Sequence, residues 1–239
     1  CIRDSIIGVS EAMLRRLESL GAPADKLNHL PAFVDLDRFD YHDHSSAGPR
    51  FLAVGRFAET KSPHLTLLAF RQVVAAMPDA TLTMIGKGGG GELFEASLIL
   101  AKALDIEGSV AFRGVLSHAE VAQEMREARV FVQHSITTPL YGDREGKPVA
   151  VMEAMASGLA IVATRHSGID ELIEHGEQGL LVDEYDVDGM AASMLALATD
   201  DEQVTRLGAA ASRRVREDPL IGQHVSILNR WIEQSIADN

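Results

Sequence analysis

The sequence has 239 residues, with 22 Lys and Arg against 35 Asp and Glu, so its formal net charge is −13. We do not expect such an acidic chain to bind nucleic acid, because that binding needs clustered positive charge. Its apolar runs are shorter than the roughly 18 residues of a membrane-spanning helix, so we expect neither a transmembrane helix nor a signal peptide. The single cysteine, Cys1, excludes a disulfide framework. These features predict a cytoplasmic globular protein of one or two domains.

The first fifty residues predict a short strand–helix–strand unit followed by a linker. Residues 6–9 are expected to form a strand, Ser10 to cap the helix that follows, and Leu30–Val34 to form a second strand. Residues 40–50 are polar and rich in turn formers, so we expect a boundary near residues 36–50. Because the chain lacks an initial methionine and opens inside this unit, we expect it to be a fragment.

From residue 51 onward, short apolar strands alternate with amphipathic helices. The expected strands cover residues 51–54, 80–85, 109–112, 130–133, 159–164 and 179–182. The expected helices begin near residues 62, 92, 117, 148 and 186. Because the strands are continuous apolar runs, this alternation predicts an α/β fold with a doubly wound parallel sheet. Such sheets bind ligands at the carboxyl ends of their strands, here the loops 55–61, 86–91, 113–116, 134–147 and 164–168.

The most informative segment is EGKPVAVMEAMASGLAIVAT, residues 145–164. Glu145 and Glu153 lie eight residues apart in it, and Pro148 suits the first turn of a helix. Free N–H groups at a helix start bind anions, while two carboxylates can accept hydrogen bonds from hydroxyl groups. Glu153 lies in a largely apolar helix, where a carboxylate needs a partner. The pattern predicts a sugar-nucleotide site.

Two cations follow the first strand of the expected sheet. Arg56 comes directly after Gly55 at the end of the strand, and Lys61 follows five residues later. Such a pair suits a diphosphate, because Arg makes planar bidentate contacts and Lys supplies a point charge. Taken alone, a solvated Arg and Lys beside a helix start would be the simpler interpretation. The pairing with Glu145 and Glu153 is what favours the diphosphate site.

These segments resemble the nucleotide-sugar-binding half of family 4 (group 1) retaining glycosyltransferases, which have the GT-B fold. The matching pieces are VGRFAETKSP (54–63), MIGKG (84–88), FRG (112–114), EGKPVAVMEAMASGLAIVAT (145–164), SGIDELI (167–173) and HGEQGLLVDEYDVDGMA (175–191). The resemblance implies that residues 1–45 are the end of an N-terminal acceptor domain plus the interdomain linker. Residues 46–239 would then be the Rossmann-like donor-binding domain with its C-terminal crossover helix.

The resemblance also implies the chemistry and a role for each matching residue. The catalytic residues would be Arg56 and Lys61, which bind the donor diphosphate, and Glu145, which contacts sugar hydroxyls. Glu153 would bind the ribose. The further donor-binding positions would be Gly55, Gly86, Arg113, His134, Gly146, Lys147, Pro148 and Val149. The reaction would transfer a sugar, with retention, from a nucleotide diphosphate sugar to a carbohydrate or glycolipid acceptor in polysaccharide biosynthesis. No metal would be obligatory, because Arg and Lys neutralise the leaving diphosphate.

The sequence departs from this family in two places. It has Ala32-Phe33-Val34-Asp35 where the family often has Asn-Gly-Val-Asp, and the resemblance implies that most of an N-terminal acceptor domain is missing from this chain. A domain that binds the donor without catalysis is therefore an alternative function, and a GT-B-fold nucleotide-sugar epimerase is another. Peripheral membrane contact through the missing domain stays open. Exposed apolar surface on residues 1–35 and 219–236 leads us to expect self-association of the chain.

Several patterns admit a second interpretation. Glu145 and Glu153 could be the acid/base pair of a glycosidase. Residues 86–91 fit the dinucleotide fingerprint G-x-G-x-x-G, although Asp105 precedes the next strand where the ribose-binding acid should end it. A turn that brings the backbone close to a nucleotide is the simpler interpretation of these glycines. His134 is either a donor contact or a structural histidine.

Two acidic patterns near the expected linker have metal-like residue types. Asp40, His42, Asp43 and His44 cluster there, but a solvated linker rarely holds ligand geometry. Asp35-Leu36-Asp37 resembles the metal motif of the other major glycosyltransferase fold, and we interpret it as incidental.

Overall fold

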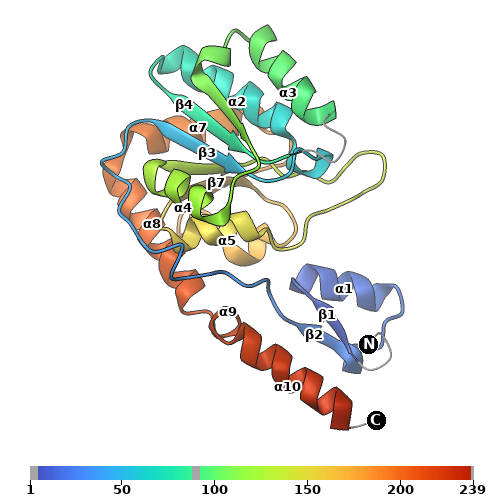
Figure 1. Ribbon diagram of the computed structural model, residues 1–239. Coiled ribbons are helices and arrows are strands. Elements are labelled where there is room, and N and C mark those ends of the chain that lie inside the picture. Colours follow the sequence, from blue (N-terminus) through green and yellow to red (C-terminus); the bar gives the residue numbers. More distant parts are fainter. Residues whose placement is uncertain (1–4, 88–91, 238–239) are drawn as a thin grey trace.

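The computed structural model describes residues 5–87 and 92–237 and contains two parallel sheets. The larger sheet has six strands in the order β5-β4-β3-β6-β7-β8, and each of its pairings is parallel. The smaller sheet has two strands and forms, with helix α1, a unit that lies below the larger one in Figure 1. The expected α/β fold with a doubly wound parallel sheet is therefore confirmed.

The strands of the larger sheet are β3 (Arg50–Val54), β4 (Thr81–Ile85), β5 (Val110–Gly114), β6 (Val130–Gln133), β7 (Ala160–Thr164) and β8 (Leu180–Val182). Its helices are α2 (Pro63–Ala76), α3 (Glu92–Ala103), α4 (His118–Glu127), α5 (Val149–Ala156), α6 (Ile169–Leu172), α7 (Val187–Thr199) and α8 (Asp201–Arg216). The smaller unit contains β1 (Ile6–Gly8), α1 (Glu11–Ser19) and β2 (Leu27–His29), and the chain continues into α9 (Pro219–Gly222) and α10 (His224–Ala237). Each strand of the larger sheet lies where an apolar run predicted it, with ends shifted by at most two residues.

The hydrophobic core lies on both faces of the larger sheet. Successive side chains of a strand point to opposite faces, and β6 illustrates the consequence. Phe131 packs in the cluster that includes α4 and α5, whereas Val130 and Val132 pack in the cluster that includes α2 and α7. Because every residue of β6 is buried, its apolar run carries no polar alternation.

The smaller unit confirms one expectation and corrects another. The Ser10 hydroxyl accepts a hydrogen bond of 3.1 Å from the Met13 N–H and so caps α1 as predicted. The second strand was predicted at Leu30–Val34, which was wrong, because the strand that pairs with β1 is β2. Leu30 still donates to the Gly8 carbonyl, but Pro31 has no N–H with which to continue the ladder. Leu30 and Val34 are apolar because the protein interior buries them.

The segment between the two units is fixed to the larger one. Both ring nitrogens of His44 lie within hydrogen-bond distance of carbonyl oxygens, 2.8 Å from Ala128 and 3.0 Å from Ser157. Burial lowers the pKa of His44, against the opposing effect of these two carbonyls. The buried Arg129 guanidinium also donates to carbonyls of this segment, at Ser45 and Ala47. The expectation of a solvated linker was therefore wrong at His44.

The last helix returns to the smaller unit. Nδ1 of His224, at the start of α10, lies 2.9 Å from the Pro31 carbonyl, and its ring centroid lies 6.2 Å from that of Phe33. Figure 1 shows α10 running below β2 toward the end of the chain. None of the helices in the described ranges is long and apolar enough to cross a bilayer.

Candidate functional site

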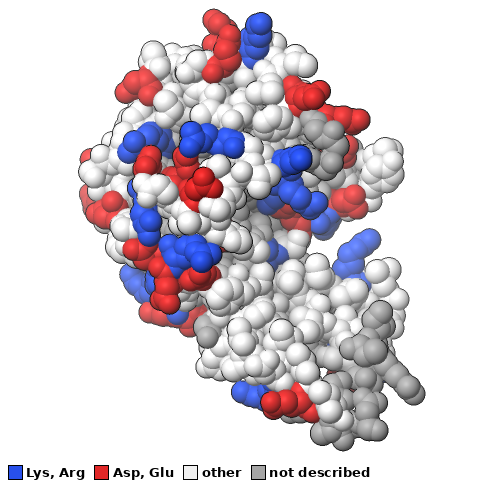
Figure 2. Space-filling model, in the orientation of Figure 1, with Lys and Arg blue, Asp and Glu red and all other residues white. Residues whose placement is uncertain are grey.

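The loops that follow β3 and β6 enclose an open pocket at the carboxyl edge of the larger sheet. The pocket is lined by Arg56, Ala58, Glu59, Thr60, Lys61, Thr138, Tyr141, Asp143, Arg144, Glu145, Gly146 and Pro148. Figure 2 shows the surface hollowed between the larger and the smaller unit, with Lys and Arg side chains on both sides of the hollow. The predicted residues Arg56, Lys61 and Glu145 are thus brought together.

Glu145 and Lys61 form an ion pair in this pocket. Nζ of Lys61 lies 2.6 Å from Oε2 of Glu145, and both side chains are less than one-fifth exposed. The Glu145 carboxylate also accepts hydrogen bonds from the side chains of Thr60, Gln133 and Ser135, at 3.2–3.4 Å. Burial lowers the pKa of Lys61 from its usual value, outweighing the attraction of Glu145. The carboxylate is therefore held in one orientation by four neighbours.

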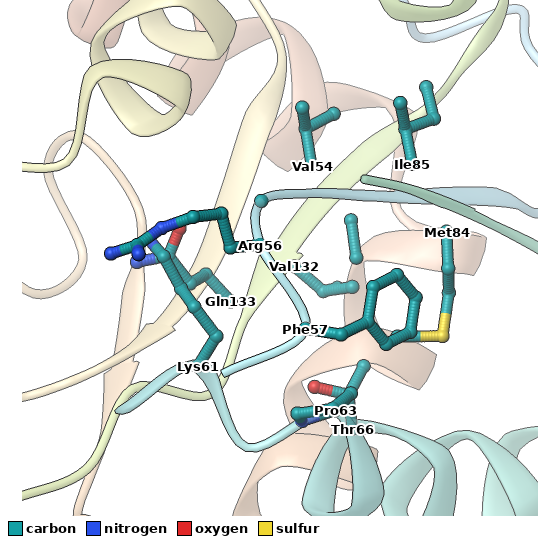
Figure 3. A pocket seen from close by; sticks show the side chains of 12 residues that line it. Val54, Arg56, Phe57, Lys61, Pro63, Thr66, Met84, Ile85, Val132 and Gln133 are labelled. Carbon is teal, nitrogen blue, oxygen red and sulfur yellow. The ribbon is translucent and has the colours of Figure 1, made fainter. Parts of the chain in front are cut away.

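Arg56 lies beside this ion pair and is exposed. Figure 3 shows its guanidinium and the Lys61 side chain reaching toward the same region, next to the Gln133 amide. Within the described part of the chain, no carboxylate pairs with Arg56. Of the two cations that follow β3, Lys61 is therefore neutralised by Glu145 and Arg56 is not, while Arg144 from the loop before α5 also lines the pocket.

Helix α5 begins at the edge of the pocket. Pro148 precedes its first residue, Val149, and no side chain in the described part of the chain caps the helix start. The Val151 N–H donates to the Pro148 carbonyl (3.2 Å), so the N–H groups of Val149 and Ala150 are the ones that face other acceptors. Gly146 is closely packed, because a Cβ atom there would lie 2.8 Å from the Val9 side chain. A Cβ on Gly168 would lie 2.7 Å from the Gly146 carbonyl. The loop before α5 therefore packs tightly between the smaller unit and the segment after β7.

The Lys147 side chain turns away from the pocket and becomes buried. Its Nζ lies 3.3 Å from Oε2 of Glu171, which is on α6. The Glu171 carboxylate also accepts the backbone N–H groups of Glu11 (3.1 Å) and Ala12 (2.8 Å), at the start of α1. Burial acts to raise the pKa of Glu171, but these backbone donors and Lys147 lower it overall. Lys147 thus ties the loop before α5 to the smaller unit.

A buried histidine supports the backbone of Glu145. The N–H of Glu145 donates to Nε2 of His166 (3.1 Å), and Nδ1 of the same ring lies 2.7 Å from Oε1 of Glu184. Since Nε2 accepts, we assign the ring proton to Nδ1. Burial acts to raise the pKa of Glu184, but the hydrogen bonds from His166 and Thr137 lower it overall. Hydrogen bonds between Glu184 and His166 and between His166 and Glu145 thus connect the loop after β8 to the pocket.

Glu153 lies on α5, apart from the Lys61–Glu145 pair, and only 8% of it is exposed. In the described ranges, no side chain or backbone group hydrogen-bonds to its carboxylate. Burial raises its pKa, against the weaker opposing effects of His118 and Arg38. A buried carboxylate without a donor is costly, so the position calls for a hydroxyl or another donor.

The ends of β3 and β4 meet at Gly55 and Gly86. Gly86 has φ +142°, and a Cβ atom there would lie 1.9 Å from the Gly55 carbonyl oxygen. The Gly86 N–H donates to the Gly114 carbonyl (2.7 Å), which continues the sheet toward β5. Residue 86 must therefore be glycine for steric reasons. Residues 88–91 of the predicted glycine loop lie outside the described part of the chain.

Arg113 and His134 are held by neighbouring elements. Arg113 is about half exposed, and its Nη2 lies 3.1 Å from the Glu124 carboxylate on α4. His134 is fully buried, and its Nε2 accepts the Tyr185 N–H (3.1 Å). Burial lowers the pKa of His134 to about 4, with a further lowering from His64. His134 thus anchors Tyr185, and its role as a donor contact stays a prediction.

Gln133, Ser135 and Glu184 were not among the predicted site residues. Gln133 and Ser135 lie at the end of β6, a strand that the sequence predicted. Both side chains donate hydrogen bonds to the Glu145 carboxylate. Glu184 follows β8 by two residues. Applying the strand-end rule to β8 as well would have found it.

A family model described as "Glycosyl transferases group 1" matches residues 38–214. The chain is 33% identical over 224 residues to the amylovoran biosynthesis glycosyltransferase AmsK of Erwinia amylovora, covering 92% of this chain and 53% of that protein. It is 30% identical over 214 residues to the phosphatidyl-myo-inositol mannosyltransferase of Mycolicibacterium smegmatis, covering 87% of this chain and 52% of that protein. The chain belongs to the glycosyl transferases group 1 family. It spans about half the length of these relatives.

Solved structures agree on the fold. Anabaena HepE in complex with UDP and glucose superposes with a TM-score of 0.82 at 19% identity, covering 95% of this chain and 63% of that one. The C-terminal domain of the group 1 glycosyl transferase LpcC from Francisella tularensis superposes with a TM-score of 0.66 at 21% identity, covering 77% of this chain and 97% of that one. The family resemblance and its GT-B-type fold are therefore confirmed.

Proposed function

We propose that this chain is the donor-binding part of a retaining glycosyltransferase. It would bind a nucleotide diphosphate sugar, whose sugar the whole enzyme transfers to a carbohydrate or glycolipid acceptor. The observation that carries this proposal is the Lys61–Glu145 ion pair, which lies beside the exposed Arg56 and the start of α5. The pocket thus combines cations for phosphate with a fixed carboxylate for hydroxyl groups.

The donor diphosphate would lie between Arg56 and Lys61. A bound diphosphate would supply the negative charge that Arg56 lacks and would share Lys61 with Glu145. The free N–H groups at Val149 and its neighbours would face the phosphates or the sugar. In the transition state, charge develops on the leaving diphosphate, and these fixed groups would stabilise it without a metal ion.

The two glutamates would bind different parts of the donor. Glu145, held by Lys61 and its hydrogen-bond donors, would accept hydrogen bonds from sugar hydroxyls. Glu153, which is buried without a donor of its own, would accept hydrogen bonds from the ribose. The loops at residues 85–88 and 113–115 would line the base, although residue 88 lies outside the described part of the chain. The complexes of HepE with UDP and glucose and with UDP-glucose support a donor of this chemical class.

The acceptor would be bound mainly by protein outside this chain. We propose that residues 1–45 are the end of an acceptor domain with its linker, and that residues 46–239 are the donor domain. The separately crystallised C-terminal domain of LpcC supports such a division. The names of the relatives, which concern amylovoran, colanic acid and phosphatidylinositol mannosides, support a polysaccharide or glycolipid acceptor. Nucleotide sugars are made in the cytoplasm, so we place the enzyme there, with membrane contact through the acceptor domain.

Calorimetric titration tests the donor site. The wild type is titrated with UDP, GDP, ADP and their glucose or mannose conjugates, and the measurement is repeated on Arg56→Ala and Glu153→Ala. Arg71→Ala serves as the control, because Arg71 is an exposed arginine on α2 that does not line the pocket. We expect saturable binding of one nucleotide series, weakened by the first two substitutions and unchanged by the control. Absence of binding to every nucleotide would contradict the proposal.

A binding domain without catalysis is the second candidate, because the chain spans about half of its relatives. Adding acceptor to the whole protein in the presence of the nucleotide sugar distinguishes a transferase from a binding domain. Release of free nucleotide diphosphate only with acceptor present supports transfer. Isomerised sugar nucleotide without acceptor would instead support an epimerase.

A further inference from the structure

An apolar pair projects from the loop between β6 and α5, the yellow-green loop that extends from the sheet in Figure 1. Leu140 and Tyr141 at its tip are 77% and 75% exposed. Single exposed apolar side chains are common and need no explanation. What distinguishes Tyr141 is its place, because it lines the pocket that contains Glu145, whereas Leu140 does not.

The base of this loop is rigidly held. The Thr137 N–H donates to Oε2 of Glu184 (2.7 Å), and its hydroxyl donates to Oε1 (3.1 Å). The hydroxyl of Tyr185 donates to the Thr137 carbonyl (3.1 Å). Every polar group of Thr137 is thus bound by the segment after β8, which fixes where the loop leaves the sheet.

The tip is a closed turn. The Thr138 N–H donates to the Asp143 carbonyl (3.0 Å), and the Gly142 N–H donates to the Thr138 carbonyl (2.9 Å). The Asp143 N–H donates to the Thr138 hydroxyl (2.8 Å). These three bonds hold Tyr141 at the pocket wall at little further cost in conformational entropy when a ligand binds.

Tyr141 has the chemistry of a sugar-stacking surface. Among the described residues that line this pocket it alone is aromatic, and the others are mainly polar or charged. The face of an aromatic ring carries partial negative charge, whereas one face of a pyranose presents weakly positive C–H groups. The hydroxyls at the edge of a pyranose can meanwhile bind the carboxylates and cations nearby.

We propose that Tyr141 stacks on a pyranose ring bound in this pocket. This inference rests on the proposed function and names a subsite within it. The ring would come either from the donor sugar or from the acceptor, and both sources present the same C–H face to the tyrosine. The aromatic ring, and not the phenolic hydroxyl, makes the contact.

The test compares Tyr141→Ala and Tyr141→Phe with Leu140→Ala, a matched control that is equally exposed in the same turn. Calorimetry measures Kd for UDP, UDP-glucose, GDP and GDP-mannose. Saturation-transfer NMR follows methyl α-glucoside and methyl α-mannoside in the presence of the nucleotide diphosphate. We expect Tyr141→Ala to weaken binding of the pyranose-bearing ligand about tenfold, with free nucleotides unaffected and with Tyr141→Phe and Leu140→Ala near the wild type.

The results distinguish a ring of the donor from a ring of the acceptor, and failure of the stacking inference from failure of the proposed function. A loss confined to the sugar nucleotide assigns the stacked ring to the donor, and a loss confined to the methyl glycoside assigns it to the acceptor. Unchanged binding of both in Tyr141→Ala, or equal weakening in Leu140→Ala, would overturn the inference while the nucleotide site stands. A wild type that binds none of the nucleotides would instead overturn the proposed function.

Discussion

His166 and Glu184 form a hydrogen-bonded pair, with Nδ1 of the histidine 2.7 Å from Oε1 of the glutamate. The pair fixes the tautomer of the ring, so that Nε2 faces the backbone N–H of Glu145 as an acceptor. The same Glu184 carboxylate binds the N–H and the hydroxyl of Thr137. One side chain outside the pocket therefore positions both ends of the loop between β6 and α5.

Replacing Glu184 tests this arrangement. Glu184→Ala removes the acceptor for His166 and Thr137, so we expect Glu145 to lose its fixed position and sugar-nucleotide affinity to fall roughly tenfold. Titration calorimetry with the sugar nucleotide and with the free nucleotide measures the change, which should be larger for the former. Asp183→Ala is the matched control, because the Asp183 side chain is 85% exposed and lies one residue away. Equal losses in the two variants would contradict the positioning role.

The Lys61–Glu145 pair predicts a non-additive effect on stability. Lys61→Met leaves the Glu145 carboxylate buried without its cation, which we expect to lower the free energy of unfolding by about 3 kcal/mol. Adding Glu145→Gln removes that charge and should recover most of the loss. Urea denaturation of both single variants and the double variant measures the coupling. Additive losses would mean that the two charges do not depend on each other.

His134 predicts a loss of stability in acid. Its pKa is lowered from 6.5 to about 4 by burial, so the native state binds fewer protons than the unfolded state between these values. Stability is fully present above pH 6.5 and falls as the pH drops toward 4, by about 3 kcal/mol from this group. Urea denaturation of the wild type and His134→Gln across this range should give a shallower dependence for the variant. Parallel curves would refute the assignment.

For Glu153 we expect a contribution to stability that depends on pH in the opposite direction. Because burial raises its pKa, the group favours the native state in acid, and this contribution is lost as the pH rises through the folded pKa. Glu153→Gln removes the buried charge at neutral pH and keeps the shape of the side chain. We expect the variant to be more stable than the wild type at pH 7 and to lose that advantage below about pH 4, near the ordinary pKa of a glutamate. Thermal unfolding at the two pH values measures this, and a variant less stable at pH 7 would contradict it.

The exposed apolar side chains near the two ends of the chain predict self-association. Leu20, Phe33, Ile232 and Ile236 are each at least half exposed. Ile232→Lys should therefore reduce the mass that light scattering measures at high protein concentration. Ile99→Lys is the control, because Ile99 is 70% exposed on the distant helix α3. A monomeric wild type would contradict the prediction.

The order of strands and helices could be predicted because it depends on local apolar runs. The proximity of Lys61 and Glu145 could also be predicted, since the two residues follow strands β3 and β6, which end at the same edge of the larger sheet. The position of β2 could not be predicted. The apolar residues Leu30 and Val34 resemble a strand, but they pack in the protein interior outside the β1–β2 pairing. Likewise, nothing local to Lys147 indicates that its ammonium group turns to Glu171, since that contact depends on how the smaller unit docks.

The contact between Gly55 and Gly86 bears on mutational tolerance. Any side chain at residue 86 would have to displace the Gly55 carbonyl, 1.9 Å from the place of its first carbon, and would push β3 away from β4. Arg56 directly follows Gly55, so such a shift would move the exposed cation as well. A scan of substitutions would therefore find residue 86 as intolerant as Glu145, although it need not touch any ligand. Loss of activity at such a position measures the geometry of the strand ends and does not by itself identify a binding residue.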